Sequence, residues 1–171
     1  MNGLNKTIFV TFPRSGHHLL IRGLHVALPQ ELVYSEFYQC EHNMDNCFAV
    51  NAQKDHDFEL KREVEGYRYV VQVRDVTDCL YSWYIALNSK ESFREFYEVN
   101  EKYYDRFIAK WVESEIDNRL VIKYEDLVKE KKETVLKVAY FMSKGEIDFS
   151  KRFAHLEAWE IGENNYLNLK K

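Results

Sequence analysis

The segment Pro13-Arg14-Ser15-Gly16-His17-His18 combines residue types that bind anions. Arg14 carries a permanent charge on a planar guanidinium, which suits phosphate and sulfate oxygens. Ser15 and the two imidazoles add side-chain donors, and Gly16 lets the backbone approach an anion closely. The first N–H groups of a helix lack intrahelical partners and carry partial positive charge. A helix starting here predicts a phosphate cradle; the alternative is a plain turn capped by Ser15.

The elements around this segment have the order needed to position such a site. The β-branched and aromatic run from Thr7 to Phe12 predicts a buried strand, and leucines at helical spacing predict a helix that ends before Pro29. Further strands are predicted at 47–53 (weak), 67–73 and 119–124, and helices at about 77–87 and 126–142. Alternating strands and helices predict an α/β protein with three α/β/α layers and a central parallel sheet.

Length and composition narrow the class of protein. The 171 residues are 46% hydrophobic and 30% charged, which indicates one globular domain over 1–171, with a motif-bearing core at about 7–142 and a polar tail at 145–171 that includes a short helix near 149–159. A net charge of −4 gives no overall positive field, so nucleic acid is not an expected partner. The aromatic stripe at 93–111 is interpreted first as the buried side of a long helix.

The cysteines and the apolar runs bear on location and on metal binding. The sequence contains no run of 18 apolar residues, so no membrane span is predicted. Its three cysteines fit a reducing cytoplasm better than a disulfide framework. Cys40, His42, Cys47 and His56 match no compact zinc spacing, so no metal is expected. The Gly-Lys-Ser/Thr nucleotide loop and the G-x-G-x-x-G pattern are both absent from the sequence.

Three ordered segments resemble the sulfotransferases that use 3′-phosphoadenosine 5′-phosphosulfate (PAPS). Phe12–Leu20 resembles the 5′-phosphosulfate loop of that family, and Val73–Tyr84 resembles its 3′-phosphate segment. Leu120–Leu127 resembles the strand that ends in Tyr-Glu-Asp-Leu, an element expected to be mainly structural. The resemblance implies a P-loop-kinase-like sulfotransferase fold, with PAPS as co-substrate and adenosine 3′,5′-bisphosphate (PAP) as product.

The resemblance also implies which residues bind the donor. The 5′-phosphosulfate would be held by the loop and the start of the helix, with Leu19 beside the adenine; the residues are Arg14, Ser15, Gly16, His17, His18 and Leu19. Arg74, at a strand end, and Ser82, on the following helix, would hold the 3′-phosphate. In a parallel sheet the ligand crevice lies outside the carboxyl ends of the strands, so Arg14 and Arg74 are expected to converge there.

Gln53-Lys54-Asp55-His56-Asp57 looks like the Lys-Thr-His segment of the same family. The resemblance makes His56 the general base, with Lys54 beside the transferring sulfuryl group and Arg14 beside the leaving phosphate. An imidazole with a pKa near neutrality suits removal of a hydroxyl proton, and Asp55 or Asp57 is expected to orient it.

The acceptor is left open among hydroxyls of small molecules, sugars, lipids and peptides, and residues 30–47 and 93–111 are expected to line its side. Two other functions remain. The family's later Arg-Lys-Gly loop has only a faint counterpart at Ser143-Lys144-Gly145, which favours a relative that binds PAP or PAPS with weak or no turnover. A P-loop-type nucleotide kinase is the third interpretation.

Overall fold

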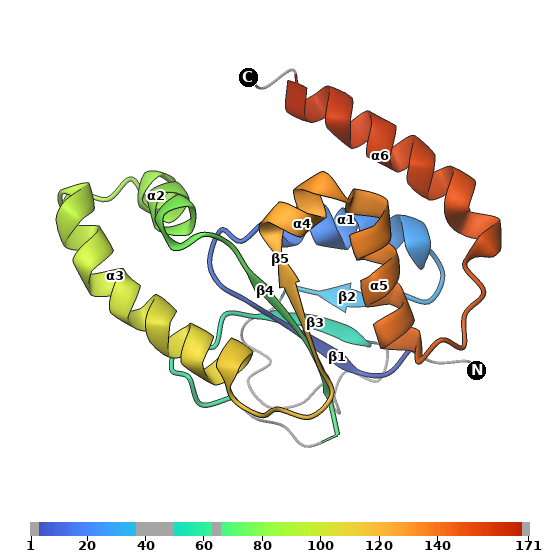
Figure 1. Ribbon diagram of the computed structural model, residues 1–171, viewed down its shortest axis with the longest axis horizontal. Coiled ribbons are helices and arrows are strands. Elements are labelled where there is room, and N and C mark those ends of the chain that lie inside the picture. Colours follow the sequence, from blue (N-terminus) through green and yellow to red (C-terminus); the bar gives the residue numbers. More distant parts are fainter. Residues whose placement is uncertain (1–3, 37–49, 63–65, 169–171) are drawn as a thin grey trace.

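The protein, described by a computed structural model over residues 4–36, 50–62 and 66–168, is built on a five-stranded sheet in which all pairings are parallel (Figure 1). The strand order is β2-β3-β1-β4-β5. The strands are β1 (Thr7–Thr11), β2 (Tyr34–Ser35), β3 (Ala52–Asp55), β4 (Arg68–Val73) and β5 (Arg119–Lys123).

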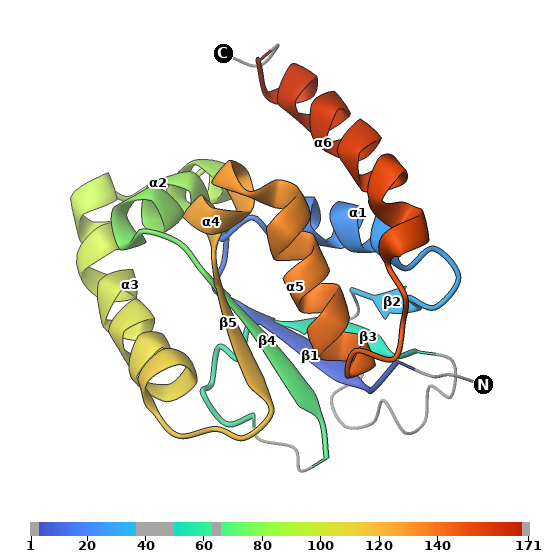
Figure 2. The ribbon, with the colours of Figure 1, turned by 45° about the vertical axis from the view of Figure 1, so that its right-hand side comes forward.

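Helices cover both faces of the sheet (Figures 1 and 2). One face is covered by α1 (His17–Ala27), α4 (Tyr124–Lys129) and α5 (Lys131–Ser143), with α6 (Phe153–Asn168) packed outside α1 and α5. The other is covered by α2 (Val76–Leu87) and α3 (Phe93–Ile108), which continues into a π-helical turn, Ala109–Glu113. The predicted three-layer α/β/α class is confirmed.

The strand sequences explain the two cores. Phe9 and Val70 face the α1 and α5 side, whereas Ile8, Val10 and Val71 face the α2 and α3 side. Side chains alternate between the faces of a strand, so a strand covered on both sides must be apolar throughout. This requirement is why the continuous apolar runs of β1 and β4 could be recognised in the sequence.

Several boundaries differ from the predictions. The weak strand predicted at 47–53 lies at Ala52–Asp55, because pairing with β1 recruits polar residues, and residues 47–49 are outside the described chain. The helix predicted at 126–142 is divided at Glu130 into α4 and α5. The short helix predicted near 149–159 is a 3₁₀ turn at Ser150–Arg152 followed by the longer α6, and β2 was not predicted.

Close contact fixes α1 against its neighbours at Gly23. A Cβ at this position would lie 2.4 Å from Val135 Cγ2 on α5 and 2.8 Å from the Trp159 ring on α6. A glycine inside a helix normally lowers stability, but Gly23 allows α1, α5 and α6 to pack closely together.

The strand order sets where a ligand can bind. β1 lies between β3 and β4, and the chain leaves β1 and β4 towards opposite faces to form α1 and α2. Such a reversal opens a crevice at the carboxyl ends of the two strands. The loop after β1 and the junction after β4 therefore share one edge of the sheet.

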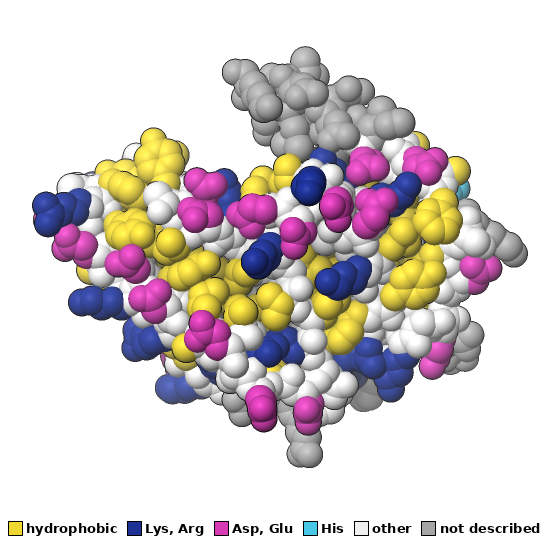
Figure 3. All heavy atoms as spheres, in the orientation of Figure 1, with side chains coloured by type: hydrophobic (Ala, Val, Ile, Leu, Met, Phe, Trp, Pro, Cys, Tyr) yellow, Lys and Arg dark blue, Asp and Glu magenta, His cyan; other side chains and the backbone are white. Residues whose placement is uncertain are grey.

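The surface carries charges of both signs. Figure 3 shows acidic and basic side chains interspersed on one face, with apolar side chains exposed among them. No helix in the described part of the chain is long and apolar enough to cross a membrane.

Candidate active site

The turn between β1 and α1 depends on a glycine. Gly16 is the N-cap of α1 and has a φ of 89°, a left-handed conformation that L side chains rarely adopt. A Cβ there would lie 2.3 Å from the ring of Tyr124, at the start of α4. Arg14, with a φ of 66°, is exposed at the outside of the turn. The backbone is thus folded tightly around the N-terminus of α1, as an anion cradle requires.

Three polar atoms around this turn are buried. Among the described residues, Ser15 Oγ, His17 Nδ1 and Arg74 Nε have no hydrogen-bond partner. Buried polar atoms are normally paired, and an unpaired one is costly. Two of the three belong to the predicted phosphosulfate loop and the third to the predicted 3′-phosphate segment. Their donor chemistry fits a ligand that presents phosphate and sulfate oxygens.

The two predicted anion-binding segments touch each other. Arg14 Nε donates a hydrogen bond of 3.1 Å to Ser82 Oγ on α2. Arg14 and Ser82 are 68 positions apart, and this contact brings the loop after β1 and the helix after β4 together. The segments that carry Arg14 and Arg74, two residues expected to converge, therefore meet through the contact of Arg14 with Ser82.

Arg74 leaves the end of β4 and lies on an aromatic ring. Its guanidinium carbon is 4.4 Å from the centre of the Tyr124 ring, and its Nη2 donates to Asp78 Oδ2 at 3.1 Å. The Tyr104 hydroxyl donates to the Arg74 carbonyl at 2.7 Å. Backbone and guanidinium are thus both held at the crevice.

Tyr124 was not recognised as part of the site from the sequence. Its ring touches Gly16 on the predicted phosphosulfate loop and stacks under the Arg74 guanidinium. Its neighbour Glu125 accepts the backbone N–H of Asp75 at 3.1 Å, so it bonds to the β4–α2 junction. The signal that could have revealed Tyr124 is its place directly after β5, the third strand to end at this edge.

His17 is buried rather than presented at the surface. Its Nε2 lies 2.6 Å from the Tyr34 hydroxyl, and its ring packs edge-on against Phe9. Burial, with Lys54 next in importance, holds the pKa of His17 well below its usual value, so the ring is neutral at pH 7. Tyr34 lies on the two-residue strand β2, too short to be recognised in the sequence.

The other predicted donor-binding residues are placed differently. His18 is exposed, and its Nδ1 lies 3.4 Å from Glu36 Oε1. Leu19 is buried and belongs to the core beneath α1. Lys54 is buried in β3, and its charge lowers the pKa of both His17 and His56.

His56 follows β3, and its tautomer is set by the backbone. Its Nδ1 is bonded to the Thr11 carbonyl at the end of β1, so Nδ1 carries the proton and Nε2 is the acceptor nitrogen of the neutral ring. Desolvation by burial is the main cause that lowers the pKa of His56 to about 4, and Lys54 adds to it. The expected pKa near neutrality is therefore wrong for the free protein.

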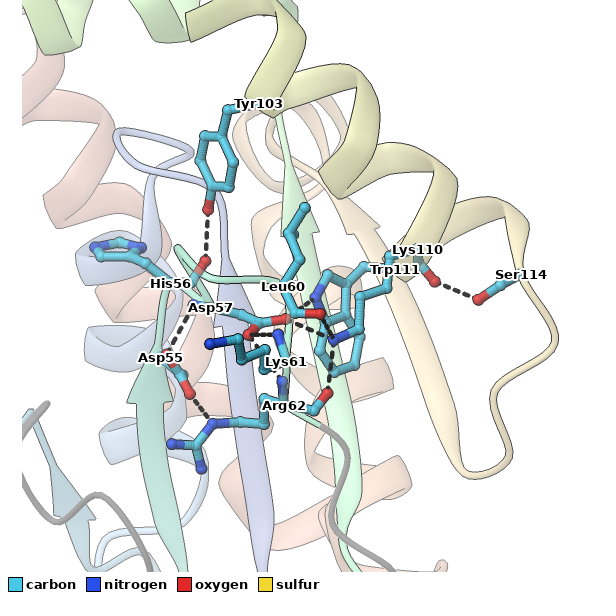
Figure 4. A network of polar contacts seen from close by, with 10 residues as sticks. All are labelled: Asp55, His56, Asp57, Leu60, Lys61, Arg62, Tyr103, Lys110, Trp111 and Ser114. Carbon is cyan, nitrogen blue, oxygen red and sulfur yellow. Dashed lines mark hydrogen bonds and ion pairs between the residues drawn. The ribbon is translucent and has the colours of Figure 1, made fainter.

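The carboxylates of Asp55 and Asp57, one of which was expected to orient the imidazole, are bonded to other groups. Asp55 accepts the backbone N–H of Asp57 and pairs with Arg62, and Asp57 pairs with Lys110 (Figure 4). Both carboxylates hold the loop after His56, and the group bonded directly to the ring is the Thr11 carbonyl.

An aromatic surface lies beside His56. The Phe58 ring, whose residue is 55% exposed, is centred 5.2 Å from the imidazole, 6.1 Å from Trp83 and 5.8 Å from Tyr103. Trp83 follows Ser82 on α2, so this surface extends from the imidazole towards the predicted 3′-phosphate segment. Of the predicted acceptor side, residues 37–47 lie outside the described chain.

No group of three or more His, Cys, Asp or Glu within the described ranges is placed to hold a metal ion. Cys40, His42 and Cys47, the cysteines and histidine considered with His56 for zinc, lie outside those ranges. Ser143-Lys144-Gly145 forms the left-handed end of α5, next to Asn5 before β1. That position is at the edge of the sheet opposite to Arg14 and Arg74.

Comparisons with known proteins agree with this geometry. A search of curated proteins found no match. In fold the chain is similar to a crystal structure of a sulfotransferase from Alicyclobacillus acidocaldarius, with 12% sequence identity, a TM-score of 0.52, and coverage of 91% of this chain and 95% of that chain. Residues 60–160 match the family model of the sulfotransferase domain, a range that contains Arg74, Ser82 and Tyr124. That range is more than half of the sequence, and the chain therefore belongs to the sulfotransferase family.

Proposed function

We propose that this sulfotransferase moves a sulfuryl group from PAPS to a hydroxyl acceptor, with His56 as general base. The observation that carries the proposal is the set of buried, unpartnered polar atoms on Ser15, His17 and Arg74. They lie on two segments that are joined by the Arg14–Ser82 hydrogen bond and by the Tyr124 ring. A ligand with an anionic group at each end would satisfy atoms on both segments.

The loop and the start of α1 bind the 5′-phosphosulfate in this proposal. Gly16 opens the backbone, and Ser15 and the first N–H groups of α1 donate to the oxygens. His17 Nδ1 would gain a partner there, which requires the tautomer that carries its proton on Nδ1. Arg14 extends from the loop to Ser82 at the crevice. The exposed His18 lies at the outside of the loop, and the buried Leu19 packs in the core beneath α1.

Arg74 and Ser82 bind the 3′-phosphate. Arg74 supplies charge from the end of β4, and Ser82 supplies a hydroxyl from α2. Tyr124 positions both ends, since its ring limits where Gly16 and Arg74 can lie. The donor supplies the activated sulfuryl group, and no metal is needed in this proposal.

The chemistry assigned to the chain is proton removal and charge stabilisation. His56 Nε2 takes the proton of the acceptor hydroxyl while that oxygen bonds to sulfur and the bond from sulfur to the 5′-phosphate oxygen breaks. Lys54 lies beside the sulfuryl oxygens, and Arg14 stabilises the charge gained by the leaving phosphate. The acceptor is an alcohol or phenol whose apolar part packs on Phe58.

The low pKa of His56 favours one alternative, a relative that binds PAP or PAPS with little turnover. A base with a pKa of about 4 is weak, although it is unprotonated at neutral pH. The negative donor beside Lys54 would offset the charge that lowers this pKa and make the imidazole more basic. The proposal therefore needs the pKa of His56 to rise when the donor binds.

The sparse cysteines favour the cytoplasm as the location of the protein.

Two measurements test the proposal. PAP should raise the melting temperature, whereas ADP and AMP should not, because only PAP reaches Arg74 and the phosphosulfate loop together. Arg74→Ala should abolish that rise. An equal rise with ATP–Mg²⁺ would favour the kinase instead.

The second measurement is sulfuryl transfer from PAPS to a panel of phenols and alcohols. His56→Ala should abolish turnover and leave PAP binding intact, while the matched variant His155→Ala, at an exposed position on α6, should behave as wild type. Tight PAP binding with no transfer by the wild type would support the binding-only alternative.

A further inference from the structure

The loop that follows His56 is folded around a buried carboxylate. The side chain of Asp57 is 4% exposed, and its backbone has a φ of 45°. Its Oδ1 accepts the backbone N–H groups of Lys61 and Arg62, both at 2.9 Å. Its Oδ2 accepts Lys110 Nζ at 2.9 Å and Trp111 Nε1 at 2.8 Å (Figure 4). Four donors thus satisfy one carboxylate.

Both side-chain donors come from the π-helical turn at the end of α3. Lys110 and Trp111 are adjacent residues in the turn Ala109–Glu113, whose i+5 hydrogen bond runs from Ser114 N–H to the Ala109 carbonyl. Lys110 Nζ also donates to the carbonyls of Leu60 and Arg62, at 2.8 and 2.9 Å. π-Helical turns inside α-helices occur frequently at functional sites. Here the turn binds both ends of the loop 57–62.

A second contact from α3 reaches His56 itself. The Tyr103 hydroxyl donates to the His56 carbonyl at 2.7 Å, two turns before Lys110 along the helix (Figure 4). On its other side the His56 ring is bonded to the Thr11 carbonyl. The backbone of His56 is therefore fixed from α3, and its ring from β1.

We infer that Asp57 is a positioning residue for catalysis: with Lys110 and Trp111 it holds the His56 imidazole in the orientation and tautomer that leave Nε2 as the proton acceptor. The inference rests on the proposed role of His56 as base. A buried ion pair is a poor means of adding stability, because desolvation offsets its attraction. An ion pair between Asp57 and Lys110 beside a catalytic base is explained by the need to place the His56 imidazole accurately. A misplacement of about 1 Å can lower a rate on the order of 100-fold.

The decisive variant is Asp57→Asn, which keeps the size and one carbonyl oxygen but removes the charge facing Lys110. We expect kcat to fall about 10- to 100-fold while the dissociation constant of PAP stays within about twofold, because Asp57 contacts none of the donor-binding residues. The matched control is Arg152→Gln, which removes one charge of another partly buried pair, Glu31–Arg152. It should lower stability and leave kcat unchanged.

A spectroscopic measurement separates this inference from the proposed function. NMR of ¹³C,¹⁵N-labelled protein reports the imidazole tautomer directly. Wild-type His56 should carry its proton on Nδ1, and Asp57→Asn should shift the ring towards a mixture of tautomers. If the wild type transfers no sulfuryl group but the tautomer responds in this way, the proposed function fails and the positioning role of Asp57 stands.

Other results would overturn the inference. Should Asp57→Asn lose stability as Arg152→Gln does, with kcat and the His56 tautomer unchanged, Asp57 is only a structural residue. Where Asp57→Asn does not fold, Trp111→Phe and Tyr103→Phe decide, since each removes a single donor. Both should lower kcat severalfold without weakening PAP binding, and wild-type kcat in both would refute the positioning role.

Discussion

Acidification should destabilise the folded protein through the His56 imidazole. Burial is the main reason that the pKa of His56 falls from 6.5 to about 4, with the charge of Lys54 acting in the same direction. The unfolded chain therefore takes up this proton at a higher pH than the folded chain. The contribution of neutral His56 to the free energy of unfolding is fully present above pH 6.5 and is lost as the pH falls towards 4.

The size of this effect follows from the two pKa values. Their difference corresponds to about 3 kcal/mol in the free energy of unfolding, of which about 2 kcal/mol is lost by about pH 5. His56→Gln removes the titrating group and retains a side chain able to donate to the Thr11 carbonyl. The loss of stability between about pH 7 and pH 5 should be smaller in His56→Gln than in the wild type by about 2 kcal/mol.

Urea denaturation at several pH values measures this difference. His17, whose pKa burial also lowers, is present in both proteins, so its contribution cancels in the comparison. The control His155→Gln, at an exposed site, should follow the wild type. Equal losses of stability in the wild type and in His56→Gln would refute the conclusion that His56 is buried as a neutral base.

Two further predictions concern the glycines. Gly16→Ala should abolish PAP binding, measured by calorimetry, and lower the melting temperature. The reason is that the backbone at Gly16 is left-handed and an added Cβ would lie 2.3 Å from the Tyr124 ring. Normal PAP binding by this variant would contradict the proposed shape of the loop. Gly23→Ala should destabilise the protein despite the better helix propensity of alanine, because the added Cβ would overlap Val135 and Trp159. Adding Trp159→Ala to this variant should restore part of the lost melting temperature. Stabilisation by Gly23→Ala alone would show that α6 does not pack there.

The fold could be predicted because β1 and β4 are largely apolar runs, and because β1, β4 and β5 are each followed closely by a helix. Arg14, Arg74 and Ser82 could be placed at one edge for the same reason, since the carboxyl ends of parallel strands share an edge. The 3.1 Å contact between Arg14 and Ser82 agrees with that placement. Their roles in donor binding stay predictions.

What the sequence could not predict depends on tertiary contacts. The partner of His56 is the Thr11 carbonyl, and a backbone atom leaves no mark on the residue types. The low pKa of the ring comes from burial, which the polar context Lys-Asp-His-Asp did not suggest. Tyr34, the partner of His17, lies on a strand that exists only through its pairing with β3.

The Tyr124 ring has a consequence for how the site of this enzyme could evolve. One planar group is wedged between the turn after β1 and the guanidinium at the end of β4, so three strand-to-helix junctions form a single mechanical unit. A substitution at any one of them displaces the other two. Evolution or engineering of a differently shaped crevice must therefore change all three junctions together.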